Sequence, residues 1–326
     1  MFSVVIPLWN KRDSVERAVR SVLGQSFGGF ELIVVDDGST DGSAEAVAAI
    51  GDPRLRLLRQ ANAGPGAARN AGIEAARNDW IAFLDADDLW LPDHLAELHR
   101  IRAAHPEAGL IGTAPVRARP GDRLDPSSQP SPVIRPIRYF AEVARIGDPL
   151  NASCAAIPLA TYRTLGGFSD ARLGEDSEYW ARIALALPVA ISSRATAVYM
   201  RGTGGAMESS RGRWSGVASA REITPALALI EQRYDSIQSE QLRRDLDAFV
   251  LRYLDWTLKT LVAEGDLATV RAYRRLYRDR PPATHRLLIA LAWLPRPLAS
   301  IAQQFVVAAS SRLPRLSNSR SGAESR

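Results

Sequence analysis

Three carboxylates, Asp85, Asp87 and Asp88, follow an apolar run in the segment WIAFLDADDLW, residues 80–90. Along an extended strand, Asp85 and Asp87 point to the same face, where their charges repel each other unless a cation lies between them. Oxygen ligands suit Mg²⁺ or Mn²⁺, and such an ion keeps coordination positions for phosphate groups. The spacing therefore predicts a divalent metal site that binds a phosphorylated ligand.

Helix caps and Asx turns are the alternative explanation for these acids. That explanation fits Asp41 and Asp36, but one turn does not need the three carboxylates of DADD. Two further acidic pairs are candidates for chemistry. Asp36-Asp37 follows the apolar run LIVV, and Glu175-Asp176 opens the helical pattern EDSEYWARIALAL. Acids suit a helix N-terminus, and a carboxylate held there can also serve as a general base.

The elements that must position these acids alternate through the first 111 residues. Apolar or β-branched runs predict strands at 2–7, 30–37, 54–60 and 79–85, and helical spacing predicts helices at 12–25, 44–50, 64–77 and 92–105. Alternation of this kind predicts an α/β fold with a mostly parallel sheet flanked by helices. Ligands of such sheets bind at the carboxyl ends of the strands, which is where the acids stand.

The second half has weaker patterns. Residues 117–136 are rich in Pro, Ser and Asp and predict a long loop, residues 151–158 predict a strand, and residues 201–213 are Gly-rich. From 215 onward only helical patterns occur. We therefore predict a domain at 1–214, with one half at 1–111 and a second at 112–214, followed by a helical C-terminal region at 215–326.

Charge is unevenly placed along the chain of 326 residues, which carries a net charge of +5. Residues 1–214 hold 24 Lys and Arg against 25 Asp and Glu, whereas residues 215–326 hold 17 against 11. No interleaving of aromatic and basic residues accompanies this excess, so we expect no nucleic-acid partner. One cysteine, Cys154, excludes an internal disulfide framework, and no secretory leader is visible, which together favour the cytoplasm.

The last apolar stretch, residues 285–316, is interrupted by Pro295-Arg296-Pro297. A bilayer span takes about 20 apolar residues, so no transmembrane helix is expected. Two interpretations stay open: interfacial helices with an arginine-rich tail on an anionic membrane surface, at the inner face of the cytoplasmic membrane, or helices packed on the body of the protein.

Six segments together resemble the family 2 glycosyltransferases: VVIPLWN, FELIVVDDGSTDGS, GPGAARNAGI, FLDADDLWLP, GGFSD and GEDSEYWAR, over residues 2 to about 201. The resemblance implies the GT-A fold, with the helical region as a C-terminal extension, and an inverting transfer from a nucleoside-diphosphate sugar. It implies that residues 1–111 are the nucleotide-sugar-binding half and that residues 112–214 are the acceptor half. It implies that Pro7, Trp9 and Asp37 surround the nucleotide base and that Arg69 reaches the base or the phosphates. It also implies that Asp85 bonds the ribose.

The same resemblance implies that Asp87, together with Asp85, binds Mg²⁺ or Mn²⁺, which bridges the two phosphates of the donor. Asp176 occupies the position of the catalytic base that deprotonates the acceptor hydroxyl, and Glu175 helps to set its orientation or pKa. One departure is Thr203, which stands where many relatives have a histidine; Arg201, Arg211 or Arg213 could then neutralise the phosphates. Arg213 and Trp214 are expected to order a lid or to begin the helical extension. The four histidines form no metal-spaced cluster and are expected at the surface.

These observations predict an inverting, metal-dependent glycosyltransferase in bacterial surface polysaccharide or glycolipid assembly. We expect a UDP-sugar or dTDP-sugar donor and a saccharide or lipid-linked acceptor. A sugar-nucleotide pyrophosphorylase is disfavoured because PLWNKRDS offers no Gly-rich basic loop after the first strand. A catalytically weak or inactive nucleotide-sugar binder that acts through its helical tail stays open as the alternative.

Overall fold

The computed structural model describes residues 1–119, 121–122, 131–171, 174–201 and 225–264, and in 255–264 the backbone only. By its contacts the chain divides into two compact units, Met1–Tyr253 and Leu254–Arg326. The boundary that we predict at 214 lies outside the described residues. Helix α9 (Pro225–Arg233) and the first part of α10 (Glu240–Glu264) belong to the first unit, within which every contact below is made.

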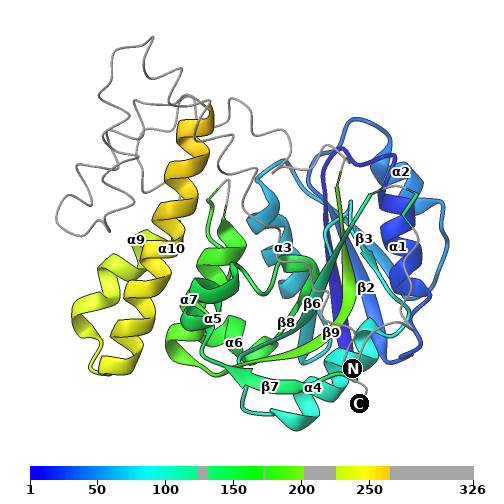
Figure 1. The fold of residues 1–326 in the computed structure, drawn as a ribbon. Helices are drawn as coiled ribbons and strands as arrows, with labels where there is room; N and C mark the ends of the chain where they lie inside the picture. The colour runs from blue at the N-terminus through cyan, green and yellow to red at the C-terminus, as the bar shows by residue number, and fades with distance from the viewer. Residues whose placement is uncertain (120, 123–130, 172–173, 202–224, 265–326) are drawn as a thin grey trace, which may run out of the picture. The chain divides into compact units, whose positions relative to one another are not determined.

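The described strands form one mixed sheet in the order β3-β2-β1-β4-β8-β6-β9-β5, with β7 paired to β9 (Figure 1). The first half is parallel, as predicted, and consists of β1 (Phe2–Leu8), β2 (Phe30–Asp36), β3 (Leu55–Arg59) and β4 (Trp80–Phe83). β1 and β2 are almost wholly buried, which is why they read as continuous apolar runs.

The second half of the sheet departs from the mostly parallel expectation. β8 (Ala155–Pro158) runs antiparallel to both β4 and β6 (Leu110–Ala118), and β9 (Val189–Met200) is parallel to β6. Two short strands, β5 (Leu89–Trp90) and β7 (Ile134–Ile137), pair antiparallel with β9. Neighbouring parallel strands need a crossover connection, usually a helix, but antiparallel strands do not. The alternation of strand and helix patterns, which predicts the first half, is therefore no guide to the second half.

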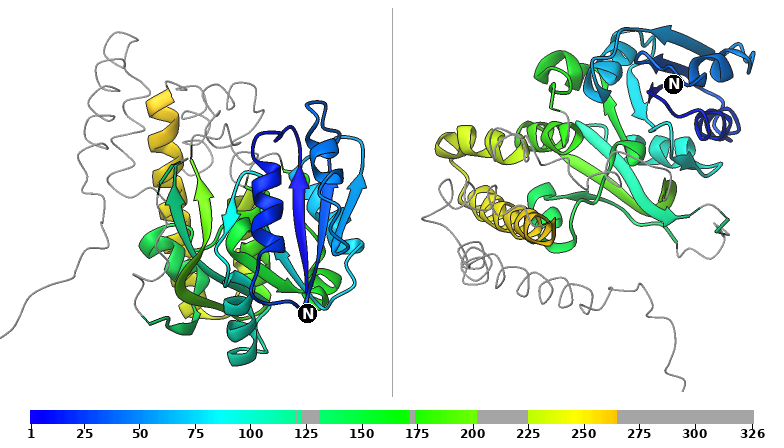
Figure 2. Two further views of the ribbon diagram at one scale, coloured as in Figure 1. Left: turned by 90° about the vertical axis from the view of Figure 1, so that its right-hand side faces the viewer. Right: turned by 90° about the horizontal axis from the view of Figure 1, so that it is seen from above.

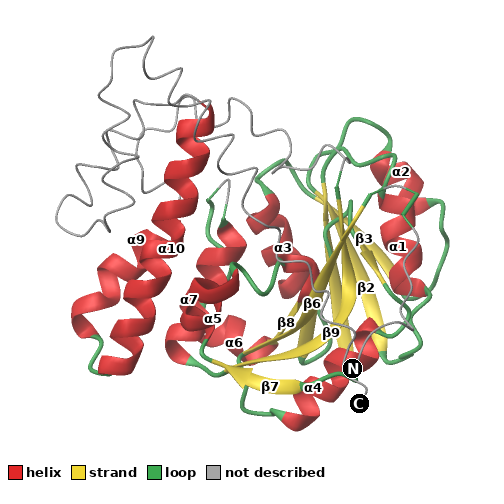
Figure 3. Cartoon of the chain, viewed as in Figure 1, coloured by secondary structure: helices red, strands yellow, loops and turns green. Residues whose placement is uncertain are grey.

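Helices cover both faces of the sheet. α1 (Val15–Leu23) lies on one side and α3 (Pro65–Glu74) on the other (Figures 1 and 3). The remaining helices are α2 (Ser43–Ala48), α4 (His94–Ala104), α5 (Tyr139–Ile146), α6 (Leu159–Leu165) and α7 (Glu175–Ala186), with 3-10 turns at Ala152–Cys154 and Tyr234–Ser236. Figure 2 shows α9 and the first part of α10, in yellow, beside the green helices of the second half and away from the blue parallel strands.

Two features bring α3 and α7 close to the sheet. Gly72 of α3 lies so near β1 that a Cβ there would overlap the side chain of Val5. Beside α7, Phe83, Phe168, Tyr179 and Trp180 form a ring cluster with centroids 4.5–6.1 Å apart. Packing of this kind fixes the start of α7 relative to the end of β4.

The described helices include none that is both long enough and apolar enough to cross a membrane.

Candidate active site

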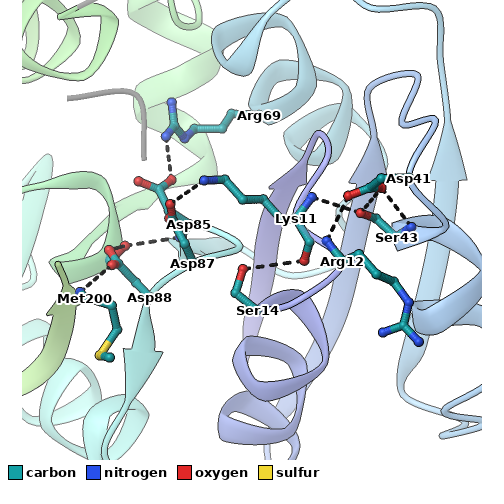
Figure 4. Close-up of polar contacts among 11 residues, drawn as sticks. Lys11, Arg12, Ser14, Asp41, Ser43, Arg69, Asp85, Asp87, Asp88 and Met200 are labelled. Carbon is teal, nitrogen blue, oxygen red and sulfur yellow. Dashed lines mark hydrogen bonds and ion pairs between the residues drawn. The ribbon is translucent and has the colours of Figure 1, made fainter. Parts of the chain in front are cut away.

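The three acids of DADD lie in a turn that follows β4. β4 ends at Phe83, and the amide of Asp88 donates to the carbonyl of Asp85 at 3.0 Å. The strand predicted over 79–85 is therefore shorter than expected, and the premise that Asp85 and Asp87 share one face of an extended strand is wrong. Within the turn, each of the three carboxylates has its own hydrogen-bond partners (Figure 4).

Asp85 is bound by a buried guanidinium. Arg69 Nη2 donates to Asp85 Oδ1 at 2.6 Å, and Arg69 Nη1 donates to Glu175 Oε1 at 2.8 Å. The Arg69 side chain is only 4% exposed. Burial alone would lower its pKa, but Asp85, Glu175 and Asp176 raise that pKa above its ordinary value. Arg69 therefore joins the turn after β4 to the start of α7.

Asp87 is paired with a lysine that our sequence analysis did not assign to the site. Lys11 Nζ lies 2.8 Å from Asp87 Oδ2, and the Asp87 side chain is 16% exposed. Lys11 follows β1, so this ion pair connects the ends of β1 and β4 (Figure 4). The rarity of lysine was a signal for Lys11 in the sequence, because Lys11 and Lys259 are the only lysines of the chain.

Asp88 faces the interior. Its Oδ2 accepts from Ser153 Oγ at 2.6 Å, and its Oδ1 accepts from the Met200 amide at 2.9 Å. Burial, and then the charges of Asp85 and Asp87, raise the pKa of Asp88 well above its ordinary range. Ser153 also accepts from the Asp85 amide at 3.1 Å. Asp88 thus fastens the turn to β9 and to the 3-10 turn before β8, and its role is structural.

Two oxygens of the turn are suited to a divalent ion. Asp85 Oδ2 and Asp87 Oδ1 accept no hydrogen bond from the described residues, whereas the other oxygen of each carboxylate is bound by Arg69 or Lys11. Both side chains are partly exposed. Among the described residues no group of three or more His, Cys, Asp or Glu is arranged for a metal. The donor set therefore fits Mg²⁺ or Mn²⁺ only if phosphate and water oxygens complete the shell.

Glu175 and Asp176 begin α7, as the helical pattern of the sequence predicts. Gly174 precedes them with φ +73°, a conformation that favours glycine. Glu175 is buried against Arg69, whereas Asp176 is partly exposed. Burial raises the pKa of Asp176 to about 7, Glu175 and Asp148 raise it as well, and Arg69 lowers it. A carboxyl with such a pKa is poised to accept a proton near neutral pH.

The residues predicted to surround the base lie at the ends of β1 and β2. Pro7 stands in β1 opposite Val35 of β2, and Trp9 follows β1 with 56% of its surface exposed. Asp37 is buried and accepts from the Ala63 and Gly64 amides at 2.9 and 2.8 Å. Asp37 therefore also holds the loop that precedes α3 and Arg69. The nucleotide roles of these residues stay predictions.

Asn70 is a second residue that sequence reasoning missed. Its Nδ2 donates to the Phe168 carbonyl and its Oδ1 accepts from the Phe168 amide, each at 2.9 Å. This pair ties α3 to the Gly166–Phe168 bend that precedes α7. An asparagine in a helix carries no such signal in the sequence, because its partner is 98 residues away.

The expectation that all four histidines lie at the surface is wrong for His94. This residue is fully buried, stacks on Trp90 with ring centroids 4.2 Å apart, and has Nδ1 2.8 Å from Thr196 Oγ1. Burial lowers its pKa to about 3, so the ring is neutral. Thr203, Arg211, Arg213 and Trp214 lie outside the described residues, and Arg201 is exposed at the end of β9.

A mixed sheet whose parallel strands end in an acidic turn, faced by an acidic helix start, is the arrangement of the GT-A fold. Solved structures share this fold. TarS 1–349 of S. aureus in complex with UDP-GlcNAc superposes with a TM-score of 0.69 at 18% identity, covering 95% of this chain and 91% of that one. The mannosyltransferase PcManGT of Pyrobaculum calidifontis, in complex with GDP-Man and Mn²⁺, gives 0.61 at 21% identity over 95% and 86%.

Residues 3–162 match the family model described as glycosyl transferase family 2. These residues form a domain of that family, and the resemblance and fold class predicted from the sequence are confirmed. Curated relatives include the succinoglycan biosynthesis protein ExoO of Rhizobium meliloti, 50% identical over 95 residues, and the uncharacterized glycosyltransferase YibD of Escherichia coli, 46% identical over 88 residues. These matches cover 29% and 26% of this chain, and only 27% and 26% of the relatives' lengths.

Proposed function

We propose that the protein is an inverting glycosyltransferase that moves a sugar from a nucleoside-diphosphate sugar to an acceptor hydroxyl. The observation that carries this proposal is the position of Arg69, which binds Asp85 and Glu175 at once. Through it, the turn predicted to hold the donor and the helix start predicted to supply the base become parts of a single site. Two separate sites could each bind a donor or an acceptor, but they could not transfer the sugar from one to the other.

Asp176 acts as the general base in this proposal. As the acceptor oxygen attacks the anomeric carbon, the hydroxyl proton passes to the Asp176 carboxylate, and the bond from the sugar to the diphosphate breaks. Such a direct displacement inverts the anomeric configuration. The elevated pKa of Asp176, about 7, matches this task because a stronger base takes the proton more readily. Glu175 and Arg69 hold the start of α7 in place.

Asp87 and Asp85 would hold Mg²⁺ or Mn²⁺ through the oxygens that Lys11 and Arg69 leave free. When bound, the ion would neutralise the charge that develops on the departing diphosphate. Support comes from the donor set and from the Mn²⁺ in the PcManGT complex. Lys11 would supply a second positive charge beside the phosphates, and Trp9 would stack on the nucleotide base.

For the substrates we propose a UDP-sugar or dTDP-sugar donor and a saccharide or lipid-linked acceptor, in bacterial surface polysaccharide or glycolipid assembly. The complex of TarS with UDP-GlcNAc supports the donor class, and the role of ExoO in succinoglycan biosynthesis supports the process. The basic and apolar sequence after Pro281 supports a cytoplasmic protein at the inner face of the membrane, where a lipid-linked acceptor would be presented.

Asp176→Asn tests the proposal most directly. We expect the variant to bind a nucleoside diphosphate with nearly unchanged affinity and to lose turnover by about 10²–10⁴-fold, the usual contribution of a general base. Turnover is measured as release of UDP, dTDP or GDP from a panel of nucleotide-sugars with Mn²⁺, with water or a membrane extract as acceptor. Asp170→Asn, which changes a nearby exposed acid in the same way, is the control.

A change of less than threefold in Asp176→Asn would refute the base assignment. If the wild-type protein binds a nucleoside diphosphate but releases none from any sugar donor, acceptor or metal combination, the transferase proposal fails and the non-catalytic binder replaces it.

A further inference from the structure

Lys11 and Arg69 both bind acids of the site, but their charged ends are held very differently. Lys11 Nζ lies 2.8 Å from Asp87 Oδ2, and among the described residues this ion pair is the one that it makes. The Lys11 side chain is 21% exposed. By contrast, the Arg69 side chain is 4% exposed and is held by Asp85 and Glu175 together. Lys11 can therefore change its partner more readily than Arg69 can.

The backbone of Lys11 is fixed although its side chain is not. Its amide donates to Ser43 Oγ at 2.9 Å, and its carbonyl accepts from the amides of Ser14 and Val15 at 3.1 and 2.9 Å. These bonds tie the residue to the starts of α1 and α2. Figure 4 shows the side chain extended from this point to the DADD turn, residues 85–88. A flexible four-carbon stem on a fixed backbone lets the ammonium move locally while the loop stays in place.

Asp87 is also one of the two carboxylates that we propose hold the divalent ion. Lys11 binds its Oδ2, and Oδ1 is the oxygen that we assign to the ion. An ammonium and a divalent cation on one carboxylate repel each other, and the Asp87 side chain, which is 16% exposed, lies where water screens that repulsion poorly. The diphosphate of a donor brings negative charge that attracts both cations. The partner of Lys11 should therefore depend on which ligands are bound.

We propose that Lys11 is a mobile counter-ion that competes with the divalent ion for Asp87 and moves to the diphosphate of the donor when the ion binds. This inference rests on the function proposed above and deepens it. In this scheme, Lys11 opposes binding of the metal alone and supports binding of the nucleotide without metal. The ion is therefore held weakly until a diphosphate draws Lys11 away from Asp87.

Removal of the lysine charge should have opposite effects on the two ligands. Lys11→Met keeps an unbranched side chain but frees Asp87 Oδ2 and removes a positive charge, so Mn²⁺ alone should bind more tightly. UDP without metal should bind more weakly, because the acids of the turn then face the diphosphate without that charge. We expect each dissociation constant to change by about three- to tenfold, the scale of one charge in a partly solvated site. A purely structural role of Lys11 would weaken the binding of both ligands instead.

The experiment uses the full chain and needs no sugar transfer. Binding of Mn²⁺ without nucleotide is measured by electron paramagnetic resonance, in which the signal of hydrated Mn²⁺ falls as the ion binds. Binding of UDP, dTDP and GDP in EDTA is measured by isothermal titration calorimetry. Arg12→Met is the matched control, because it removes the next positive charge of the same loop, and Figure 4 shows the Arg12 side chain directed away from the DADD turn. This control should leave the dissociation constants unchanged.

A double variant connects the effect to the carboxylate. When Asp87→Ala is already present, Lys11→Met should tighten Mn²⁺ binding by less than about twofold, because the two cations no longer share a carboxylate. The inference would be overturned by Lys11→Met protein that binds Mn²⁺ no more tightly than the wild type, or that does not bind it detectably. Unchanged nucleotide binding in EDTA, or an equal gain of Mn²⁺ affinity in Arg12→Met, would overturn it as well.

Failure of this inference can be told apart from failure of the proposed function. If nucleotide binding by Asp87→Ala depends on Mn²⁺ as it does in the wild type, the metal role itself is refuted. If that dependence is lost but Lys11→Met binds Mn²⁺ no better, only the competition is refuted. If the binding results are as expected but no donor releases its nucleotide, the competition stands and the transferase proposal fails.

Discussion

The acids of the DADD turn show how a folded protein keeps several carboxylates close together. Asp85 is bound by Arg69, Asp87 by Lys11, and Asp88 by a hydroxyl and a backbone amide. Each partner offsets the cost of bringing negative charge near negative charge. Arg69 and Lys11 each occupy only one oxygen of their carboxylate, and the other two oxygens are the ones that we propose bind the cation.

Asp87 should control how strongly a divalent ion promotes nucleotide binding. For the wild-type protein we expect Mn²⁺ to strengthen the binding of UDP or dTDP, and for Asp87→Ala we expect this increase, at least about tenfold or 1.4 kcal/mol, to vanish. Isothermal titration calorimetry with and without Mn²⁺ measures it. Asp52→Ala, which removes a carboxylate paired to Arg54, is the matched control. Equal Mn²⁺ dependence in Asp87→Ala and wild type would contradict the metal role.

Helix α3 is the element on which the site depends most. It carries the consecutive residues Arg69 and Asn70. Arg69 binds the DADD turn and the start of α7, and Asn70 binds the bend that precedes α7. Its distance from β1 is set by Gly72, which leaves no room for a side chain against Val5. Any shift of α3 therefore moves Arg69 relative to Asp85 and Glu175.

Gly72→Ala should destabilise the fold because its new methyl group overlaps Val5. We expect a loss of about 1–3 kcal/mol in the free energy of unfolding, the usual cost of overpacking, measured by urea denaturation. Val5→Ala alone should also destabilise, by opening a cavity. The double variant should be more stable than the sum of the two losses predicts, because the added methyl fills part of that cavity. Additive losses would show that Gly72 does not contact Val5 as described.

At the scale of the whole molecule, part of the helical region belongs to the same compact unit as the matched domain. α9 and the first part of α10 belong to the compact unit that contains the site, and the Tyr253 hydroxyl of α10 donates to Asp148, which follows α5. The net positive charge of the chain lies in residues 215–326. A region that combines basic charge with apolar segments is suited to bring the site to an anionic surface.

Truncation after Pro281 should abolish binding to anionic membranes. We expect the full chain to sediment with phosphatidylglycerol vesicles at low salt and the truncated chain to remain in the supernatant. Substitution of Arg312, Arg315 and Arg320 by Gln should weaken binding strongly, since each arginine near such a surface contributes about 1 kcal/mol. Phosphatidylcholine vesicles are the control. Full-length protein that stays in the supernatant with phosphatidylglycerol would refute membrane association.

Much of the parallel half could be predicted from local patterns. The runs at β1, β2 and β3 and the helices α1, α3 and α4 stand where periodicity places them, because burial of an apolar face leaves a regular spacing in the sequence. The mixed order beyond β4 could not be predicted in this way. The pairing of its strands is decided by contacts between segments far apart in the chain, such as β6 with β9.

By itself, the amino-acid sequence determined the family, the α/β class and the positions of the acids, since these are recorded in residue types and short spacings. Only the tertiary structure decided how the acids are used. It ended β4 before Asp85, buried His94 against Trp90, and placed Lys11 on Asp87 and Tyr253 on Asp148. Such contacts join residues from separate elements, and their energies depend on burial and distance, which exist only once the chain has folded.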